Sequence, residues 1–336
     1  RLITTGLWKP VYIEIWNDWK IESVQLKTLA LDKVSVKSGK AAKARMLADV
    51  HIESDIETQA EINVLYDGNN AYKGKVQIKK GNNQIPCPFT LRNPDLWWSN
   101  GLGKAALHDF EIVVETDESR SSFREKAGIR TAEIIREDDE WGRSLSVRLN
   151  GIDVFCKGAN WIPIDNFPNR KNRKDYDRLI YDAAVCNMNM IRVWGGGLYE
   201  GEDFYNACDS LGIMIWQDMA FACGMFPSDQ AYLDNVAQEV KDNVRRLRNH
   251  PSLVLWCGNN ENEISYFEWG WNRTLTASQQ EDYEAGLRKL FYDVIPQAIA
   301  SEDNTRYYHP SSPSTGHSGV PYSMGDAHMW SVWKGG

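Results

Sequence analysis

The feature that most constrains this fold is a change of pattern near residue 145, after which short apolar runs alternate with helical stretches. The apolar runs lie at 154–156, 190–194, 213–216 and 253–256, with weaker ones at 307–309 and 327–330. Between them, valine and leucine recur at helical spacing from residue 236 to 247. Ser278 and Glu281 have the spacing of a capping box before a further helix. Alternating strands and helices predict a parallel sheet with right-handed crossovers.

The number of apolar runs predicts a barrel that is not complete. A (β/α)8 barrel takes about 250 residues for its eight units. Residues 132–336 leave room for about six units at that rate, in agreement with the six runs. We therefore predict that residues 132–336 are the N-terminal portion of a TIM-barrel domain, with roughly its last quarter missing.

Residues 24–115 show the other periodicity, in which every second side chain is apolar. The alternation is clear from residue 45 to 53, and turn signals at 67–70 and 81–83 separate such runs. Half-buried strands joined by short turns predict an immunoglobulin-like β-sandwich over residues 22–131. No Cys…Trp…Cys spacing is present, which excludes an antibody-type domain.

Composition excludes several classes of function. The net charge is −8 and Lys and Arg form no cluster, so no nucleic-acid partner is expected. No apolar run approaches the ~20 residues that cross a bilayer, so no membrane span is expected. None of the six cysteines forms a C-x-x-C pair, which favours free, buried thiols over zinc or disulfide sites. The compartment stays open, with a periplasmic or secreted protein slightly preferred over a cytoplasmic one.

Tryptophan is the unusual part of the composition, with 14 residues. Indole faces match the apolar C–H faces of sugars, and in a barrel the functional side chains lie at the C-terminal ends of the strands. At those ends the sequence brings acidic, amide and indole groups together, as a carbohydrate site requires. The candidates are Asn160, Trp161, Arg192, Trp194, Asp218, Asn260, Glu261, His309, His328 and Trp330.

Glu261 is the strongest candidate for a catalytic group. It follows a fully apolar strand that ends at Gly258, and two asparagines precede it. A carboxyl in a partly desolvated cleft near another carboxylate has a raised pKa and donates a proton near neutral pH. The alternative is a glutamate that only stabilises the start of a helix. Glu263, two residues later, is expected to be structural.

Nucleotide and metal sites are not predicted. Gly195–Gly197 follow a strand as in a dinucleotide fingerprint, but the third glycine position is Glu200, which would repel a pyrophosphate. The glycines predict instead a sharp turn that exposes the Trp194 indole. Asp326 and His328 have side chains that bind cations, yet two ligands do not make a site. We expect no cofactor and no metal.

Several stretches taken together resemble glycoside hydrolase family 2, and within it the β-mannosidases. They are Gly6–Val11, Leu149–Gly151, Gly158–Pro163, Ile191–Gly197, Trp216–Asp218, His250–Ser252 and Trp256–Glu261. The resemblance covers nearly the whole chain. The Arg-Val-Trp-Gly-Gly-Gly stretch and the Asn-Asn-Glu ending favour a mannosidase over a galactosidase or a glucuronidase.

The resemblance implies a layout of sugar-binding jelly roll, immunoglobulin-like domain, catalytic barrel and further β domains. Residues 7–15 look like a strand, either an addition to the sandwich or the remnant of an upstream domain. The resemblance implies the second, with residues 1–21 as the last strand of a missing jelly roll. It also implies that Glu261 is the acid/base of an exo-acting, retaining enzyme and that Asn260 binds the sugar 2-hydroxyl.

The same resemblance suggests roles for the other rim residues. Trp194 would form a stacking wall and Arg192 would support the charge of the nucleophile. Asp218 would bind hydroxyls or orient the rim. The remaining sugar contacts would come from Asn160, Trp161, His328 and Trp330.

One half of the retaining mechanism is missing from the sequence. Such an enzyme needs two carboxyl groups ~5.5 Å apart. The family carries its nucleophilic Glu at the end of strand seven, but no Glu follows Glu302 here. We expect the nucleophile to lie outside this chain and the isolated chain to be inactive. The alternatives are an exo-β-glucosaminidase or β-galactosidase of the same family, or a non-catalytic carbohydrate-binding unit.

The incomplete barrel also bears on assembly. Six strands leave two open edges and an exposed interior wall, and such surfaces favour association or disorder. We therefore expect either a homo-oligomer or a barrel portion that is held less firmly than the sandwich.

Overall fold

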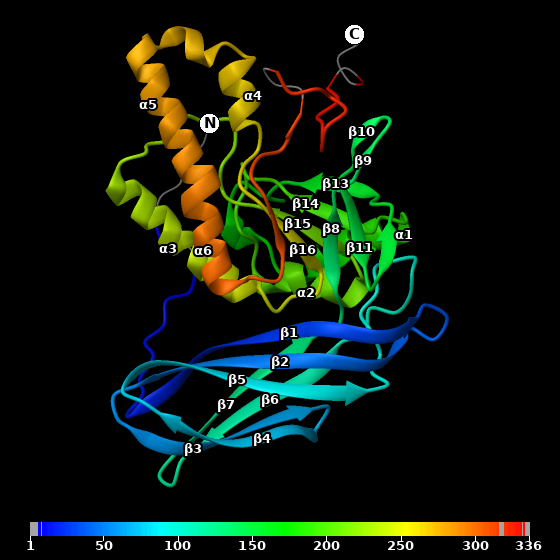
Figure 1. The fold of residues 1–336 in the computed structure, drawn as a ribbon, viewed down its shortest axis with the longest axis vertical. Helices are drawn as coiled ribbons and strands as arrows, with labels where there is room; N and C mark the ends of the chain where they lie inside the picture. Colours follow the sequence, from blue (N-terminus) through cyan, green and yellow to red (C-terminus); the bar gives the residue numbers. More distant parts are fainter. Residues whose placement is uncertain (1–5, 8, 316–318, 331, 333–336) are drawn as a thin grey trace.

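The computed structural model describes residues 6, 7, 9–315, 319–330 and 332 (Figure 1). Two parts lie one above the other along the long axis of the molecule (Figure 1). Long antiparallel strands form the first part, and from residue 158 onward the chain forms a parallel sheet with helices. No helix in these described ranges is long and apolar enough to cross a membrane.

Two antiparallel sheets share one hydrophobic core in the first part. One sheet has the order β1-β2-β5 and the other the order β4-β3-β6-β7. The strands are β1 (Trp19–Ser35), β2 (Lys40–Ser54), β3 (Thr58–Tyr66), β4 (Asn69–Ile78), β5 (Gly81–Arg92), β6 (His108–Glu115) and β7 (Arg120–Ala127). Val50 of the first sheet and Ile112 of the second are both fully buried in this core. The alternating pattern therefore gives each sheet one apolar face, and the two faces meet.

The predicted turns fall where the strands reverse. Asp67 and Gly68 have positive φ values of 46° and 77° and join β3 to β4. This left-handed backbone matches the twist of a two-residue hairpin and suits Asp and Gly. At the next turn Asn83 binds the backbone of Lys79 twice, accepting from its N–H and donating to its carbonyl oxygen.

Short antiparallel strands connect the two parts. They are β8 (Ala132–Ile135), β11 (Ser146–Leu149) and β12 (Ile152–Val154), with a hairpin of β9 (Asp138–Asp139) and β10 (Gly142–Arg143). The predicted barrel strand at 154–156 is wrong, because β12 ends at Val154 and pairs antiparallel with β11. The first parallel strand is β13 (Gly158–Trp161), whose sequence Gly-Ala-Asn-Trp carries no apolar run.

Five parallel strands form the second sheet, in the order β13-β14-β15-β16-β17. The remaining strands are β14 (Met190–Val193), β15 (Met214–Asp218), β16 (Leu253–Cys257) and β17 (Tyr307–His309). They confirm four of the predicted apolar runs. Because all five strands are parallel, their carboxyl ends meet at one edge of the sheet.

Helices cover this sheet (Figure 1). They are α1 (Arg173–Val185), α2 (Glu202–Leu211), α3 (Gln230–Leu247), α4 (Asn262–Phe267), α5 (Ala277–Arg288) and α6 (Ile295–Glu302), with the 3-10 turns η1 (Pro168–Arg170) and η2 (Trp271–Thr274) and the π-helical segment η3 (Lys289–Val294). The predicted apolar stripe of α3 is confirmed, since Val236, Val240, Val244 and Leu247 are all buried.

The capping box predicted at Ser278 and Glu281 is wrong. Helix α5 is capped two residues earlier, where Thr276 accepts a hydrogen bond from the N–H of Gln279 and the Gln279 side chain accepts one from the N–H of Thr276. Thr276 has the extended backbone that an N-cap needs, whereas Ser278 is already helical.

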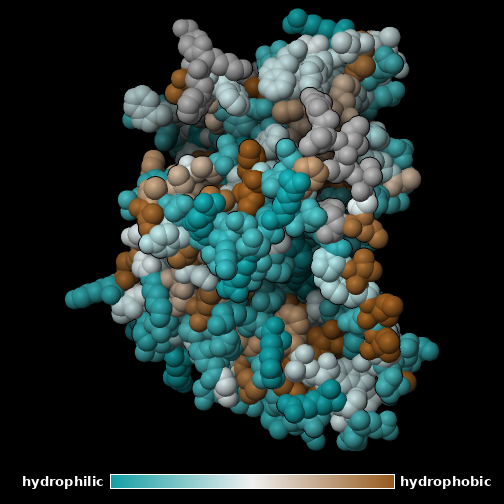
Figure 2. All heavy atoms as spheres, turned by 180° about the vertical axis from the view of Figure 1, so that it is seen from behind, coloured by the Kyte–Doolittle hydropathy of each residue, from teal (hydrophilic) through white to brown (hydrophobic). Residues whose placement is uncertain are grey.

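Two further predicted strands do not form in the described residues. Residues 327–330 make no backbone ladder, and neither do residues 7 and 9–15. Val11, Ile13 and Ile15 are 75–89% exposed, because in the described part of the chain no second strand pairs with them. Seen from the side opposite to Figure 1, the surface of the molecule is largely hydrophilic, and apolar side chains gather along one edge (Figure 2). Residues 1–5 and Trp8, which belong to the predicted N-terminal strand, lie outside the described residues.

Candidate active site

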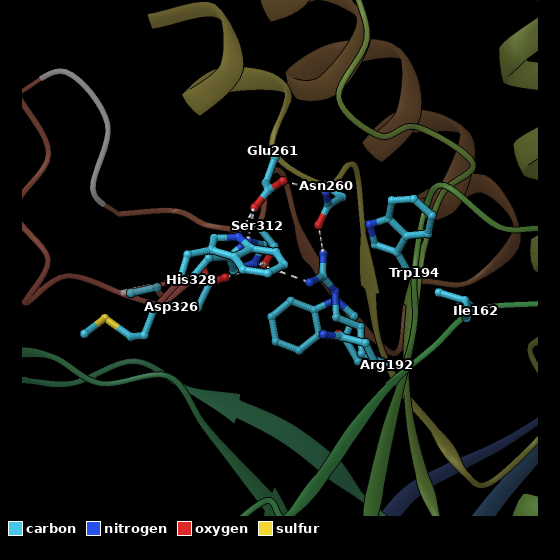
Figure 3. Close-up of a pocket in the computed structure, with 13 residues that line it drawn as sticks. Ile162, Arg192, Trp194, Asn260, Glu261, Ser312, Asp326 and His328 are labelled. Carbon is cyan, nitrogen blue, oxygen red and sulfur yellow. Dashed lines mark hydrogen bonds and ion pairs between the residues drawn. The ribbon is translucent and has the colours of Figure 1, made fainter. Parts of the chain in front are cut away.

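A cavity of about 580 Å³ opens at the carboxyl ends of the parallel strands. Its lining consists of Asn160, Ile162, Arg192, Trp194, Trp216, Asn260, Glu261, Ser312, Asp326, Ala327, His328, Met329 and Trp330 (Figure 3). The carboxyl edge of an open parallel sheet is where ligands bind in this class of fold. Seven predicted site residues meet here: Asn160, Arg192, Trp194, Asn260, Glu261, His328 and Trp330.

The backbone turns sharply out of β16 to present Glu261. A Cβ at Gly258 would lie 2.3 Å from the carbonyl oxygen of Pro310, so the close approach requires glycine. Glu261 has a φ of +62°, which is uncommon for a residue with a side chain, and its N–H donates to the carbonyl oxygen of Ser312 at 2.8 Å. Its side chain makes no capping hydrogen bond to α4. The strained turn therefore points the carboxylate into the cavity instead of toward the helix.

Four donors surround the Glu261 carboxylate. Oε1 accepts from His328 Nδ1 at 2.7 Å and from Trp330 Nε1 at 3.1 Å. Oε2 accepts from Asn260 Nδ2 at 3.3 Å and from the Cys223 thiol at 3.4 Å. Burial by itself would raise the pKa of Glu261, but the hydrogen bonds from His328 and Trp330 outweigh it and lower the pKa to about 2. The carboxyl is therefore ionised at neutral pH.

This lowered pKa contradicts the raised value expected from the sequence, and the neighbours explain the difference. The expectation assumed a second carboxylate beside Glu261. Among the described residues no carboxylate contacts it, and Asp326 is linked to it only through Ser312 and His328. Donors without a competing negative charge stabilise the anion. The carboxylate is thus in the state of a base.

The partners of His328 fix which ring nitrogen donates. Nε2 lies 3.3 Å from Arg192 Nη1 and 3.1 Å from the Ser312 hydroxyl. The ionised Glu261 carboxylate only accepts, so His328 Nδ1 carries the proton of their hydrogen bond. Arg192 and the Ser312 hydroxyl, which itself donates to Asp326, hold the other side of the ring.

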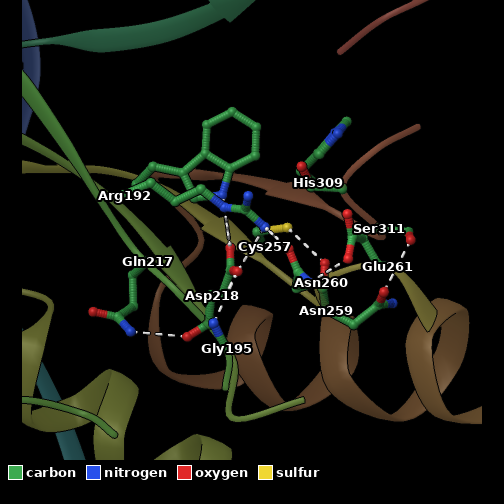
Figure 4. Close-up of polar contacts among 12 residues, drawn as sticks. Arg192, Gly195, Gln217, Asp218, Cys257, Asn259, Asn260, Glu261, His309 and Ser311 are labelled. Carbon is green, nitrogen blue, oxygen red and sulfur yellow. Dashed lines mark hydrogen bonds and ion pairs between the residues drawn. The ribbon is translucent and has the colours of Figure 1, made fainter. Parts of the chain in front are cut away.

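Arg192 crosses the floor of the cavity between Asp218 and Asn260 (Figure 4). Its Nε and Nη2 donate to the two Asp218 oxygens at 3.2 and 2.8 Å, and Nη2 also donates to Asn260 Oδ1 at 3.0 Å. The Asp218 side chain is fully buried, and it also accepts from Trp216 Nε1 and from the N–H of Gly195. Asp218 does not line the cavity; it orients the groups that do.

Trp194 lines the cavity, and the glycines after it make room for its indole. A Cβ at Gly196 would lie 1.9 Å from the Trp194 ring, and a Cβ at Gly195 would lie 2.4 Å from the carbonyl oxygen of Phe221. A side chain at either position would force the backbone or the indole to move. This geometry agrees with the sharp turn predicted for the glycine run.

Trp161 does not reach the cavity. Side chains alternate along a strand, so Asn160 faces the cavity and Trp161 faces the other side of the sheet. The Trp161 indole N–H donates to Glu200 at 3.0 Å, and its ring centroid lies 4.7 Å from that of Phe204. Lys171 also pairs with Glu200 there. The structure therefore separates Trp161 from the other predicted sugar contacts.

Asp326 and His328 do not face a common ligand position. Asp326 accepts from His309 Nε2 at 2.7 Å and from the N–H of Ser314 at 2.9 Å, and these bonds, with the one from Ser312, outweigh burial and hold its pKa below the usual range. His309 itself lies behind Asp326 and does not line the cavity. In the described part of the chain no three His, Cys, Asp or Glu side chains are grouped as a metal site requires.

Ser312 and Cys223 belong to the site but were not predicted from the sequence. Ser312 follows β17 and bridges Asp326 to His328, and Cys223 follows β15 and contacts Glu261. Both stand in loops after strand ends, which is the only sequence signal they carry. Cys223 has a φ of +44°, and this backbone state cannot be inferred from a cysteine.

Comparison with known proteins assigns the chain to a family. Residues 197–274 match the model of the TIM barrel domain of glycosyl hydrolases family 2. The protein named β-mannosidase B from Emericella nidulans is 34% identical over 351 residues, covering 99% of this chain and 39% of that relative. The β-mannosidase B of Aspergillus clavatus is 33% identical with the same coverage. The chain thus spans about two fifths of the length of these curated relatives.

Solved structures agree with the sequence matches. The crystal structure of the β-D-mannosidase from Dictyoglomus thermophilum has a TM-score of 0.82 and 33% identity, covering 96% of this chain and 38% of that chain. β-Glucuronidase 2 of Bacteroides uniformis has a TM-score of 0.68 at 16% identity, covering 86% of this chain and 33% of its own, which shows a shared fold alone. From the family model, the curated relatives and the solved structures together, the chain belongs to glycoside hydrolase family 2.

Proposed function

We propose that this chain carries the acid/base half of the active site of an exo-acting, retaining β-mannosidase that hydrolyses terminal β-D-mannosides. The observation that carries the proposal is the position of Glu261 in an open cavity at the end of β16, beside Asn260 and with Trp194 in the same lining. A carboxyl, an amide and an aromatic face are the groups that sugar hydrolysis uses. The similarity to proteins named β-mannosidase supports a mannoside as the substrate.

In this mechanism Glu261 acts twice. As an acid it protonates the leaving glycosidic oxygen while a nucleophilic carboxylate attacks the anomeric carbon. As a base it then takes a proton from the water that hydrolyses the glycosyl–enzyme. The ionised Glu261 described above is the form needed for the second step. The first step needs a protonated Glu261, and hence a higher pKa than the present contacts give.

The nucleophilic carboxylate comes from outside this chain in the proposal. A carboxylate ~5.5 Å from Glu261 would raise its pKa by repulsion and so meet the condition of the first step. No described carboxylate contacts Glu261, which supports this assignment. Because the chain spans 39% of the length of the Emericella nidulans β-mannosidase B, the activity of a longer protein is part of the proposal.

The sugar contacts follow from the lining of the cavity. Asn260 would bind the 2-hydroxyl, and Arg192, which reaches both Asn260 and Asp218, would support the charge of the nucleophile. Trp194 and Asn160 would contact the sugar ring and its hydroxyls. His328 and Trp330 would exchange their bonds to Glu261 for sugar hydroxyls when substrate enters.

The domain assignments belong to the same proposal. We assign residues 22–131 to an immunoglobulin-like domain, supported by two antiparallel sheets around one core, and residues 132–336 to the N-terminal portion of a TIM barrel, supported by the parallel strand order. The predicted boundary at residue 21 shifts, because Trp19–Ile21 pair with β2 in the first antiparallel sheet, and the residues before Trp19 would belong to a jelly roll. The alternative of a non-catalytic binding unit predicts sugar binding by a longer protein without any hydrolysis.

A glycoside panel tests the substrate. A longer protein that continues this chain as its relatives do is offered aryl β-mannoside, β-glucosaminide and β-galactoside. We expect the β-mannoside to be preferred by about 10²-fold or more in kcat/KM, with the released mannose in the β configuration by NMR. Preference for another sugar, or binding without turnover, would contradict the proposal.

A further inference from the structure

A second cavity, of about 520 Å³, lies between the antiparallel sheets and the parallel sheet. Strands β1 and β2 line one side, and residues that precede β16 and β17, including Pro251 and Arg306, line the other. The cavity therefore stands at the amino ends of the parallel strands, at the opposite edge from Glu261. We call it the basic cleft, because its lining includes Lys27, Arg130, Arg248 and Arg306.

Three of these cations already have carboxylate partners. Lys27 Nζ lies 3.3 Å from Asp49, Arg306 Nη1 lies 2.6 Å from Asp303, and Arg248 Nη1 lies 2.9 Å from Glu302. Asp303 and Glu302 are themselves fully engaged. Asp303 also accepts from the Trp256 indole and the Thr305 hydroxyl, and Glu302 accepts from Arg245. Asp303 and Glu302 therefore have little capacity for a further cation, whereas Asp49 keeps one buried oxygen, Oδ1, without a hydrogen-bond partner among the described groups.

Arg130 is the fourth cation of the lining, and it has no carboxylate partner among the described residues. Its Nε donates to the carbonyl oxygen of Pro251 at 3.0 Å and its Nη2 to that of Leu253 at 2.5 Å. Among the described residues no carboxylate lies within ion-pair distance of it. Burial, with repulsion from Arg306, lowers the pKa of Arg130 to about 9, so the surroundings disfavour its charge. Arg130 is half-buried, and a partly desolvated charge without a counter-ion is stabilised when an anion joins it.

A second donor in the same lining is also unused. Arg248 is only 2% exposed, and its Nε–H has no hydrogen-bond partner among the described groups. Buried polar groups are normally paired, so this unsatisfied N–H, on a residue that lines the cleft, calls for an acceptor. The one carboxylate in the lining, Glu133, is exposed.

We propose that the basic cleft is a binding site for an oxyanion of the phosphate or carboxylate type, with Arg130 as its principal contact. A guanidinium offers paired donors that match both kinds of anion. The anion would supply the negative charge that Arg130 lacks, and an acceptor for Arg248. Because both parts of the molecule line the cleft, a bound anion would also stabilise their contact.

Titration calorimetry on the chain tests this directly. Phosphate, citrate and chloride are added at constant ionic strength, and phosphate or citrate should bind at least about tenfold more tightly than chloride, as donation to an oxyanion predicts. Binding of citrate but not phosphate would identify a carboxylate site. Binding of phosphate but not citrate would identify a phosphate site. In Arg130→Gln the affinity should fall about tenfold or more, the effect of one lost charge-assisted hydrogen bond.

The matched control is Arg124→Gln, which removes a guanidinium that is 77% exposed on β7. It should leave anion affinity unchanged. Arg130→Lys keeps the charge but loses the paired donors of the guanidinium, so it should bind the anion with intermediate affinity. This variant keeps the test valid if Arg130→Gln does not fold. Crystals soaked in selenate should show an anomalous peak beside Arg130. Equal binding of chloride and phosphate by the native chain, or equal affinities of Arg130→Gln and Arg124→Gln, would overturn the proposal.

Discussion

Single residues decide the charge of the Glu261 carboxyl. His328 makes the shortest contact to it, at 2.7 Å, so removing this donor should change its titration most. In His328→Ala the pKa of Glu261 should rise from about 2 by roughly one unit or more, because the opposing effect of burial remains. Carbon-13 NMR of the carboxyl measures this in the chain itself. Trp330→Phe, which removes the weaker donor, should give a smaller rise; an unchanged pKa in His328→Ala would refute this assignment of the donors.

A buried histidine outside the cavity predicts how stability depends on pH. Burial would lower the pKa of His250, but Asp209 at 2.6 Å and Glu202 at 3.2 Å raise it to about 10. The folded pKa lies above the unfolded value of about 6.5, so this stabilisation is complete below pH 6.5 and is lost as the pH rises toward 10.

We expect the loss to be ~3 kcal/mol in the free energy of unfolding, within the range of buried ion pairs. Urea denaturation at pH 6, 8 and 10 measures it against His250→Asn, in which that part of the pH dependence should disappear. If the free energy of unfolding changes with pH by the same amount in both proteins, His250 does not carry the effect.

At the site, residue types could be predicted from the sequence but not all positions. The acidic, amide and indole groups at strand ends were found because parallel strands end together. Asn160 and Trp161 are neighbours in sequence, yet the period of two in a strand sends them to opposite faces of the sheet. The register that decides which one faces the cavity is set by pairing with β14, which one sequence does not reveal. The pKa of Glu261 depends on loop residues, and so it could not be predicted.

At the scale of elements, periodicity predicted the strands that are buried on both faces. Strand β16 is apolar throughout and fully buried, so its pattern was unambiguous. Strand β13 lies at the sheet edge with three exposed residues, and no apolar pattern marks it. At 327–330 the apolar run predicted a strand that does not form, because these residues line the cavity instead of entering the sheet.

The start of α5 gives a test at this scale. Thr276→Ala removes the side chain that caps the helix and should lower the free energy of unfolding by ~1 kcal/mol. Ser278→Ala is the matched control, because Ser278 lies inside the helix, and it should change stability little. Thermal denaturation monitored by circular dichroism compares the two. A larger loss in Ser278→Ala would restore the capping box that the sequence suggested.

Across the whole molecule, the two parts are joined by specific hydrogen bonds. The Trp97 indole donates to the carbonyl oxygen of Asp209 at 2.8 Å, and Asn249 Oδ1 accepts from the N–H of Leu26 at 2.9 Å. Contacts of this kind fix how the parallel sheet sits on the antiparallel sheets. Neither periodicity nor motifs could predict them, because each joins residues more than a hundred positions apart.

Limited proteolysis should distinguish the two parts. In the described structure β13 and β17 are both edge strands of the parallel sheet, and Phe155 and Ile162, which flank β13, are 84% and 61% exposed. Unpaired edges and exposed apolar groups weaken a sheet locally. We expect fragments from residues 22–131 to outlast those from the parallel part, as measured by mass spectrometry over time. Equal rates of loss would show that the two parts unfold together.

If Glu261 moves the proton during hydrolysis of a β-mannoside, the effect of replacing it must depend on the leaving group, which can be varied in a longer protein that completes the active site. Glu268, exposed at the end of α4, provides the control Glu268→Gln. For an unactivated mannoside, Glu261→Gln should lower kcat/KM by about 10²–10⁴-fold, while an aryl mannoside with an acidic leaving group should lose far less, since it leaves without protonation. Glu268→Gln should match the native rate on both. A native rate for Glu261→Gln on the unactivated mannoside would contradict the account.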